Sequence, residues 1–598
     1  MQTITQQLTE KISLAFINAG ISNENPIGLV EATRPEFGDF QVNGIMAAAK
    51  AQKTSPRDLA AKVIRCLDLS DIAEKIEIAG PGFINITLKN KFLCDFLANL
   101  TPENKFGAKV GNSQTIVVDL SSPNLAKEMH VGHLRSTVIG DSLARIFAYM
   151  GNNVIRQNHV GDWGTQFGML IAYMLEKNTD AGIKQLDQNF AIMDLEQFYV
   201  QAKIKFDSSL EFANKAREYV VKLQSGDKTT LQYWQLFTKE SQRHCDLIYD
   251  KLGVNLHSSK SGGSFIANKQ VYHIPSQCGE SFYNNKLSKI VDKLEEKKLI
   301  TLSQGAKCIF FSPGELPGGE ETPFIVQKQD GGYLYSSTDL AAIDYRVNQL
   351  LADKIIYVVD ARQSFHFKQL FLVGKKAGFA KPDTQLIHSA FGTMMNEDGR
   401  PFKTRDGGTV KLIDLIEEAI VKAKALVENL HADWDENAKN NLANALAIGA
   451  LKYADLSKNR MSDYVFSFEK MLAFDGNTAP YLMYAYTRIQ SILRKAAKTG
   501  LQIGTQINPS ELSEHKLALH LARFSEIIFA AEKECYPHYL CQYLYNLSTL
   551  FMQFYEQCPI LKADNLLQQQ SRLKLAQITA LILHDGLNLL GIQTVDRM

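Results

Sequence analysis

Cysteines, long apolar runs and an excess of charge of either sign are scarce or missing in this sequence. Its eight cysteines include no C-x-x-C pair and no Cys/His spacing typical of zinc ligands, so we expect reduced thiols and no structural metal site. No uninterrupted apolar stretch reaches the roughly 18 residues of a membrane span. The first residues, MQTITQQLTEKISLAF, lack the basic head and apolar core of a secretory signal, so we expect a cytoplasmic protein with no membrane contact.

The charges are nearly balanced, with 65 Lys and Arg against 64 Asp and Glu. The net charge therefore gives no indication of long-range attraction to nucleic acid, and any RNA contact must come from locally placed groups. No fixed-period repeat or low-complexity tract is present, which excludes a solenoid. A chain of 598 residues is too long for one core and predicts three or more domains.

The first part of the chain, to about residue 110, reads as a small α+β module. It opens with a helical period at Leu8 and Ile12 and closes on the strand-like IEIAGPGFINITL at 76–88. The polar, glycine-containing stretch 101–114 has the composition of a linker. We therefore predict a domain boundary near residue 110.

A nucleotide-binding α/β pattern follows the linker. The β-branched run TIVVDL at 115–120 predicts a buried strand, the next segment a long helix ended by Gly151, and NVIRQNHV at 153–160 a second strand. Strand, helix and strand in this order make a βαβ unit, whose ligands gather at the carboxyl ends of the strands. Strand-like and α/β patterns return after 331, so the polar region of about 175–325 is predicted to be an insertion.

From about residue 410 the pattern is almost entirely helical, which predicts a C-terminal helical bundle. The chain is thus predicted to be a multidomain α/β protein with a split Rossmann-like domain. The predicted domains are 1–110 (small α+β), 111–457 (Rossmann-like with the insertion) and 458–598 (all-α bundle).

The most informative segment is SSPNLAKEMHVGHLRST at 121–137, between the predicted strand and helix. His130 and His133 lie three apart at the start of that helix, where free backbone N–H groups and the dipole favour an anion. Gly132 keeps the backbone bare for close approach. Two histidines near a turn are also common as plain surface or core residues, so the motif alone leaves both interpretations open.

This segment strongly resembles the HIGH signature of class I aminoacyl-tRNA synthetases, and the longer string SPNxAKxxHxGHLRST resembles that of the arginyl-tRNA synthetase family. The resemblance runs from FGDFQVNGIMAAAK to the terminal GIQTVDRM. It implies a ligase that activates L-arginine with ATP and Mg²⁺ to arginyl-adenylate. The arginyl group would pass to the terminal adenosine of tRNA(Arg), releasing AMP and pyrophosphate. Positioning and electrostatic stabilisation of the phosphates would carry most of the catalysis.

The second signature expected of this class, a KMSKS loop, corresponds to GTMMNEDGRPFKTRDGGTVKL at 392–412. The resemblance implies ATP contacts from Met394 and Met395 and catalytic roles for Lys403 and Arg405. The second lysine of the signature falls at Thr404. In the resembled family a lysine just before the first histidine compensates, and here that residue is Lys127. Outside the resemblance, cations in a polar loop are more often solvated surface.

A pocket for a guanidinium needs carboxylates and a further acceptor in fixed geometry. Asp119 ends the first predicted strand, while Tyr335 and Asp339 are four apart on one face of a helical turn. The resemblance implies guanidinium contacts from these three residues, and contacts to the α-amino and carboxylate end from Asn124 and Gln363. Each could instead be a cap or a structural hydrogen-bonding residue. His366 is left without a role.

Aromatic and polar residues in both outer domains are candidates for tRNA contact. By resemblance the N-terminal module would meet the tRNA elbow and the bundle the anticodon, through base stacking and phosphate contacts. The candidates are Phe37, Phe40, Gln41, Tyr481, Tyr484, Arg488, Tyr555 and the terminal Met598. Core packing is the alternative for the phenylalanines and the tyrosine stripe. A tryptophan that some relatives have near Tyr555 has no counterpart.

Other functions fit these residues less well. A tRNA-binding paralogue without activity would not need the intact His130, His133 and Lys127 with the pocket residues. Other HxGH nucleotidyltransferases are shorter and lack an anticodon-type bundle. A synthetase specific for cysteine or methionine would favour a pocket that suits a thiol or thioether rather than one with the two carboxylates Asp119 and Asp339. The family further implies a monomer, and an activation step that needs bound tRNA.

Overall fold

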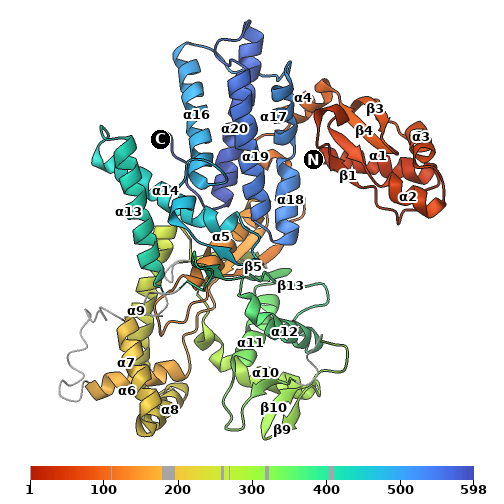
Figure 1. The fold of residues 1–598 in the computed structure, drawn as a ribbon. Helices are drawn as coiled ribbons and strands as arrows, with labels where there is room; N and C mark the ends of the chain where they lie inside the picture. Colours follow the sequence, from red (N-terminus) through yellow and green to blue (C-terminus); the bar gives the residue numbers. More distant parts are fainter. Residues whose placement is uncertain are drawn as a thin grey trace. The chain divides into compact units, whose positions relative to one another are not determined.

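The computed structural model describes residues 2–109, 111–177, 195–256, 261–267, 270–275, 277–316, 322–402 and 410–598. These group into two compact units. The first comprises Met1–Val110, Ala473–Asn588 and Gln593–Met598, and the second comprises Gly111–Leu472 and Leu589–Ile592. In Figure 1 the second unit runs from orange to cyan along the sequence colours.

The second unit is built on a parallel sheet of four strands in the order β13-β12-β5-β6. The strands are β5 Thr115–Asp119, β6 Asn153–Gln157, β12 Lys354–Tyr357 and β13 Gln385–His388. The middle of β5 is formed by three β-branched residues with no exposed surface, Ile116, Val117 and Val118, as suits a strand covered on both faces. β5 and β6 are parallel neighbours joined through helix α5, Gly132–Tyr149, which confirms the predicted βαβ unit.

The last residues of the four strands lie in register across the sheet. Asp119 pairs with Tyr357 on one side and Gln157 on the other, and Tyr357 pairs with His388. Their side chains belong to the carboxyl edge, where open parallel sheets bind ligands. Asp119, which ends a central strand, therefore lies in the middle of the edge where a site is expected.

Helix α5 packs so closely on β5 that residue 140 must be glycine. A Cβ added to Gly140 would lie 2.3 Å from the Cβ of Leu120. The helix ends at Tyr149, and Gly151 takes a φ of +97°, which a residue with a side chain rarely adopts. This confirms the predicted helix end and fixes the start of α5 beside the edge of the sheet.

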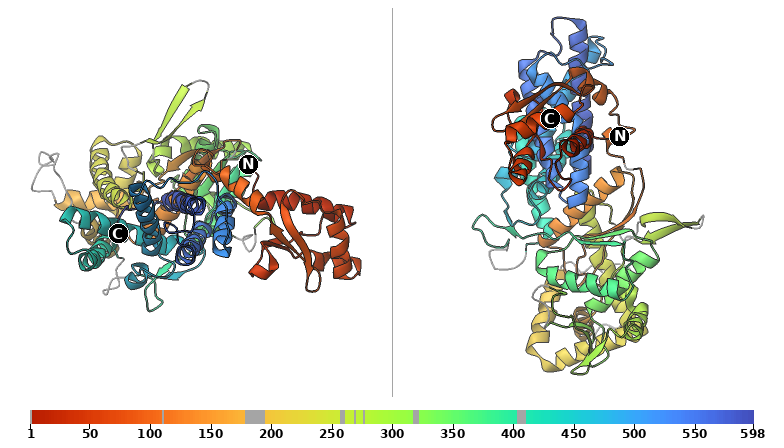
Figure 2. Two further views of the ribbon diagram at one scale, coloured as in Figure 1. Left: turned by 90° about the horizontal axis from the view of Figure 1, so that it is seen from above. Right: turned by 90° about the vertical axis from the view of Figure 1, so that its right-hand side faces the viewer.

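Between β6 and β12 the chain forms a helical group, a hairpin and a small sheet. The helices are α6 Thr165–Lys177, α7 Leu195–Ser208, α8 Leu210–Gln224 and α9 Lys228–Leu252. The antiparallel hairpin β7 Ser261–Ala267 and β8 Gln270–Pro275 extends outward from its unit in both views of Figure 2. After it come α10 Leu287–Glu296 and the antiparallel sheet β11-β10-β9, formed by Phe324–Gln327, Ala306–Ile309 and Thr301–Ser303.

Helices α11, Tyr335–Asn348, and α12, Ser364–Lys376, share one apolar core with the parallel sheet. Ile343 and Leu370 from the helices are fully buried in it, together with Val117 and Ile355 from the strands. Burial of each such side chain stabilises the fold by about 1.5–3 kcal/mol. The core thereby fixes both helices against the sheet.

The second unit closes with elements that follow β13. Two short parallel strands, β14 Met394–Met395 and β15 Tyr464–Val465, pair with each other. Between them lie α13 Leu412–Leu430 and α14 Glu436–Leu456, and α15 Phe468–Met471 follows. Arg135 of α5 and Asp455 of α14, each about 1% exposed, form an ion pair of 3.0 Å that ties α14 to α5.

The first unit contains the N-terminal module and the C-terminal helices. The module is an antiparallel sheet, β1-β2-β4-β3, with helices packed on it, which confirms the predicted α+β character. Its strands and helices are β1 Leu29–Glu31, β2 Phe40–Val42, β3 Ala73–Ala79, β4 Phe83–Leu88, α1 Ile4–Asn18, α2 Ile45–Gln52, α3 Pro56–Cys66 and α4 Asn90–Ala98. Asp39 at the start of β2 accepts from the Leu88 N–H at 2.7 Å and contacts His515 Nε2 at 2.8 Å, joining the module to the C-terminal helices.

The C-terminal helices form the predicted all-α bundle. They are α16 Ala479–Lys498, α17 Leu512–Ala522, α18 Phe524–Glu534, α19 His538–Gln557 and α20 Leu566–Leu589. Figure 1 shows α16, α17, α19 and α20 side by side. Within the part of the chain that the structure describes, no helix is both long and apolar enough to cross a membrane.

Candidate active site

The carboxylate at the end of β5 has a partner inside the protein. Asp119 Oδ2 lies 2.7 Å from the guanidinium of Arg346 on α11, and Oδ1 accepts from the Ser122 hydroxyl at 2.9 Å. Arg346 is fully buried, donates to Gln157 at 2.8 Å and lies over the Tyr357 ring. Burial acts to lower the pKa of Arg346, but Asp119 raises it well above its usual range. Asp119 is thus fixed in position by Arg346 and Ser122.

The two histidines of the HxGH segment form one hydrogen-bonded turn. The Gly132 N–H donates to His130 Nδ1 at 3.1 Å, and the His130 N–H donates to His133 Nδ1 at 3.0 Å. Because both Nδ1 atoms accept hydrogen bonds, each neutral ring carries its proton on Nε2. Each ring therefore has one N–H available to donate to an oxygen.

The surroundings keep both rings neutral. Burial lowers the pKa of His130, and the nearby cations Lys127 and Arg362 lower it further. Burial and then His130 lower the pKa of His133 to about 3. At neutral pH the pair can therefore donate hydrogen bonds to an anion without adding a fixed positive charge.

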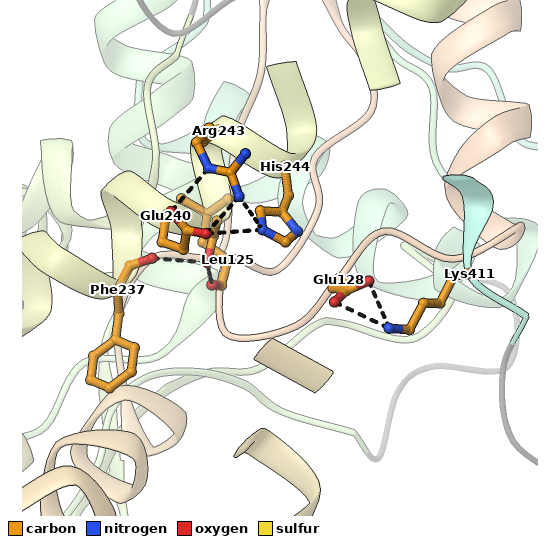
Figure 3. Close-up of polar contacts among 8 residues, drawn as sticks. Leu125, Glu128, Phe237, Glu240, Arg243, His244 and Lys411 are labelled. Atoms are coloured by element: carbon orange, nitrogen blue, oxygen red, sulfur yellow. Dashed lines mark hydrogen bonds and ion pairs between the residues drawn. The ribbon is translucent and has the colours of Figure 1, made fainter. Parts of the chain in front are cut away.

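The HxGH segment is paired with the chain that follows the predicted loop. Val131 N–H donates to the Val410 carbonyl at 3.1 Å, and Leu412 N–H donates to the Met129 carbonyl at 2.9 Å. Next to these bonds the side chains of Glu128 and Lys411 form an ion pair of 3.2 Å, seen in Figure 3. The predicted residues Lys403 and Arg405 fall outside the described residues.

Met394 and Met395 form β14, which leads to the same loop. Met394 is buried and its sulfur accepts from the Tyr464 hydroxyl at 3.0 Å, while Met395 is partly exposed. Phe402, the last residue described before the loop, donates its N–H to the Met394 carbonyl. Both ends of the loop are therefore anchored within the second unit, one on β14 and the other on the HxGH segment.

A second group of site residues lies at the starts of α11 and α12. Asp339 Oδ2 contacts His366 Nε2 at 2.7 Å, and Oδ1 lies 3.7 Å from His159 Nε2. The ring of Tyr335, a residue that is 62% exposed, meets the His366 ring edge to face at 5.0 Å between centroids. The predicted pair of Tyr335 and Asp339 is thus brought together, and His366, which had no predicted role, orients the carboxylate.

Asn124 and Gln363 have side-chain amides that are open to a ligand. Asn124 Oδ1 accepts from the Ala126 N–H at 2.9 Å, and its Nδ2 makes no hydrogen bond among the residues described. Gln363 is exposed at the start of α12, with no side-chain hydrogen bond in the same set. Asn124 follows β5 and lies beside Gly161. Both amides can therefore donate to a carboxylate or accept from an amine.

Glu280 is a site residue that the sequence did not reveal. It is partly buried, and burial, then Asp162 and Asp339, raise the pKa of its carboxyl to about 8. Its carboxyl makes no hydrogen bond or ion pair with the described part of the chain. A Cβ at Gly279 would lie 2.6 Å from the Asp162 carboxylate, so glycine at 279 is required for this approach. A partly buried, unpaired acid near Asp339 suits a cationic ligand.

Lys127 lies between the two histidines and the inserted helices. Its ammonium is 4.4 Å from the centroid of the Tyr199 ring on α7. It is also close enough to His130 to lower the pKa of that ring. The predicted phosphate-binding group Lys127, His130 and His133 is thus brought together.

The RNA-contact candidates of the N-terminal module differ in exposure. Phe40 on β2 is only 2% exposed, which supports the core-packing alternative for this ring. Phe37 and Gln41 are partly exposed, and Gln41 donates to Asn85 Oδ1 at 2.8 Å. Phe37 and Gln41 thus remain available to a partner, whereas the Phe40 ring does not.

Three bundle candidates form one cluster. The guanidinium of Arg488 lies over the Tyr484 ring at 5.3 Å and over the Tyr555 ring at 4.9 Å. Tyr484 is 36% exposed and Tyr555 is partly exposed. Tyr481 instead packs against Tyr545, with ring centroids 5.7 Å apart. Met598 is partly exposed, and the carbonyl of Asp596, two residues earlier in the chain, accepts from Arg494 on α16.

No group of three or more His, Cys, Asp or Glu that could hold a metal ion occurs in the described ranges.

Comparison with known proteins gives three matching family descriptions along the chain. Residues 96–468 match "tRNA synthetases class I (R), catalytic domain", residues 2–88 match "Arginyl tRNA synthetase N terminal domain", and residues 482–598 match "DALR anticodon binding domain". An "Arginine--tRNA ligase" of Laribacter hongkongensis is 51% identical, and one of Chromobacterium violaceum 49%, with all of each chain covered. The arginyl-tRNA synthetase of Plasmodium falciparum, known from a crystal structure, is 30% identical in sequence. The alignment covers all of both chains and has a TM-score of 0.82.

Proposed function

Since the chain belongs to the arginyl-tRNA synthetase family and is an arginine–tRNA ligase, we propose which of its residues recognise arginine, activate it with ATP and hold the tRNA. Ligation of arginine to tRNA(Arg) is its activity. Three domains divide the work: residues 1–110 and 458–598 bind tRNA, and residues 111–457, with an insertion at about 175–325, carry the chemistry.

The guanidinium of arginine binds between Asp339, Glu280 and the Tyr335 hydroxyl, and Asp119 completes the acidic surroundings. A guanidinium offers five N–H donors in one plane, so it needs acceptors on more than one side. The orientation of Asp339 by His366 at 2.7 Å supports this assignment, as does the unpaired Glu280. The ion pair of Asp119 with Arg346 supports a carboxylate that is fixed before the substrate arrives.

The other end of arginine is held by Asn124 and Gln363. The open amide of Asn124 donates to the substrate carboxylate, and that of Gln363 accepts from the α-amino group. Both amides lack side-chain partners among the described residues in the directions that the substrate would use, which supports the proposal. Fixing both ends of the amino acid orients its carboxylate for attack on the α-phosphate of ATP.

ATP binds over the HxGH segment as its Mg²⁺ complex, so the ion arrives with the substrate. The Nε2–H groups of His130 and His133 donate to phosphate oxygens, Gly132 allows close approach, and Lys127 adds positive charge. Met394 and Met395 lie against the nucleotide, and Lys403 and Arg405 neutralise the departing pyrophosphate. The anchoring of both loop ends supports their part in the step.

Activation yields arginyl-adenylate and pyrophosphate, and the arginyl group then passes to the terminal adenosine of the tRNA, with release of AMP. Charge develops on the α-phosphate, where fixed donors stabilise it more than they stabilise the ground state. The protein needs no covalent intermediate of its own. We propose that activation requires bound tRNA, as the family resemblance implies.

The tRNA meets Phe37 and Gln41 of the N-terminal module at its elbow, with Phe40 maintaining the strand beneath them. Tyr481, Tyr484, Arg488, Tyr555 and Met598 of the bundle meet the anticodon. The stacking of Arg488 between two tyrosines supports a preformed platform for unpaired bases. The enzyme works as a cytoplasmic monomer, and light scattering of the purified protein tests that state.

The observation that carries the arginine assignment is the Asp339 carboxylate, which lies 2.7 Å from His366 Nε2 and close enough to Glu280 to raise the pKa of that carboxyl. The test is ATP–pyrophosphate exchange with each amino acid, with and without tRNA(Arg). We expect exchange with arginine only, and only when tRNA is present. Exchange with arginine alone in the absence of tRNA would agree with the proposed specificity but would refute the tRNA requirement. An Asp339→Asn enzyme that uses arginine with unchanged KM would overturn the assignment of Asp339 to the arginine pocket.

A further inference from the structure

We propose that Tyr199 on the inserted helix α7 is a positioning residue for Lys127 and orients its ammonium for the phosphates of ATP. The inference rests on the proposed phosphate role of Lys127. It assigns a function in the activation step to a residue outside the nucleotide-binding core.

The contact itself is a cation over an aromatic face. Lys127 Nζ lies 4.4 Å from the centroid of the Tyr199 ring. Tyr199 is only 7% exposed, so the ring is largely shielded from water. Contacts between a cation and an aromatic ring are strongest when they are shielded in this way. Among the residues described, Nζ has no carboxylate or other hydrogen-bond partner.

The chemistry of this partner suits the proposed role. A carboxylate next to Lys127 would neutralise its charge and compete with a phosphate. An aromatic face holds an ammonium without cancelling its charge, so the N–H groups that point away from the ring stay free to donate. Tyr199 can therefore orient Lys127 and still leave it able to bind an anion.

The backbone of Lys127 is fixed on two sides, and only the tip of the side chain needs further support. The Leu125 carbonyl accepts from the Ser241 hydroxyl on α9, and Glu128 pairs with Lys411 after the predicted loop (Figure 3). A lysine side chain has four rotatable bonds beyond such a fixed base. The Tyr199 ring restricts these rotations, which prepares the ammonium for the reaction.

Helix α7 is anchored well enough to act as that support. Phe198, next to Tyr199, meets the Tyr173 ring of α6 at 5.0 Å and the Phe237 ring of α9 at 5.7 Å. Lys205 of α7 also pairs with Glu176 of α6 at 2.7 Å. The aromatic face over Lys127 is therefore held by packing on two neighbouring helices.

The test compares Tyr199→Phe, which keeps the aromatic face, with Tyr199→Leu, which replaces it by an apolar side chain. ATP–pyrophosphate exchange is measured with arginine and tRNA present. We expect Tyr199→Phe to stay within about twofold of wild type and Tyr199→Leu to lose about tenfold in kcat/KM for ATP. The KM for arginine should not change, whereas a general structural defect would raise it.

A double-variant cycle with Lys127→Ala separates the two proposals. If Tyr199 acts through Lys127, Tyr199→Leu adds no further loss once Lys127 is alanine, and an equal loss in both backgrounds would overturn the inference. Normal exchange by Lys127→Ala alone would overturn the phosphate role of Lys127. A damaged Lys127→Ala beside an undamaged Tyr199→Leu would refute only the role of Tyr199.

If Tyr199→Leu does not fold, fluorinated phenylalanines at position 199 replace it, because fluorine weakens the face of the ring with little change in shape. Exchange rates should then fall with each added fluorine. Rates that do not depend on fluorination would overturn the proposal.

Discussion

Replacing Glu280 by glutamine should remove most of the pH dependence of arginine binding. In the free protein, burial, then Asp162 and Asp339, raise the pKa of Glu280 to about 8. At pH 7 only about one carboxyl in ten is then ionised. A guanidinium next to it favours the ionised form, so binding of arginine should release a proton from Glu280.

The magnitude follows from this pKa. Below pH 8 the Kd for arginine should fall about tenfold for each unit of rising pH and level off above pH 8. At pH 7, binding should release about 0.9 proton per arginine. His159 and His366 are the other titratable groups beside Asp339, and an effect of theirs would persist in the Glu280→Gln enzyme.

Isothermal titration calorimetry with tRNA present measures both quantities, from pH 6 to 9 in buffers of different ionisation enthalpy. Glu280→Gln should flatten the pH profile and abolish the proton release. Glu24→Gln, a change at an exposed carboxyl, is the matched control and should behave as wild type. A wild-type Kd independent of pH, or a full slope that survives in Glu280→Gln, would show that Glu280 does not control the binding of arginine.

Three further predictions concern other contacts. Asp455→Asn leaves the buried Arg135 without its partner and should lower the free energy of unfolding by about 3–5 kcal/mol; a loss below about 1 kcal/mol in urea unfolding would contradict it. Arg488→Ala removes the cation between two tyrosines and should raise the KM for tRNA about tenfold, with the KM for arginine unchanged; equal changes in both would argue against an anticodon platform. Glu128→Lys should slow pyrophosphate exchange and the added Lys411→Glu should restore much of it; no rescue would show that the ion pair does not align the loop.

The parts of the fold that could be predicted from the sequence are those with strong local patterns. The β-branched run of β5 and the glycine that ends α5 carry their signals within a few residues. The HxGH segment could be placed between them for the same reason. The spacing of Tyr335 and Asp339 predicted their shared helical turn, and α11 confirms it.

The remaining features depend on contacts between distant residues. Glu280 comes near Asp339 only through the packing of the segment after the β7–β8 hairpin, and its neighbours Gly279 and Ser281 carry no charge pattern. The partner of Asp119 is Arg346, which lies far along the chain on α11. The family resemblance makes Phe40 a candidate for RNA contact, with core packing as the alternative, and the alternation of β2 turns its ring inward. Composition cannot settle such choices, since the same residue type suits either side of a strand.

If carboxylates that bind its positive charge select arginine, a charging assay with L-citrulline should show it. Citrulline has nearly the shape of arginine but carries a neutral urea group, and a site lined by several carboxyl groups should reject it strongly. The wild-type enzyme should attach arginine to tRNA(Arg) at least about 10³-fold more efficiently than citrulline, in the ratio of kcat/KM. Charging of citrulline within about tenfold of arginine would contradict the account, because shape alone would then decide the substrate.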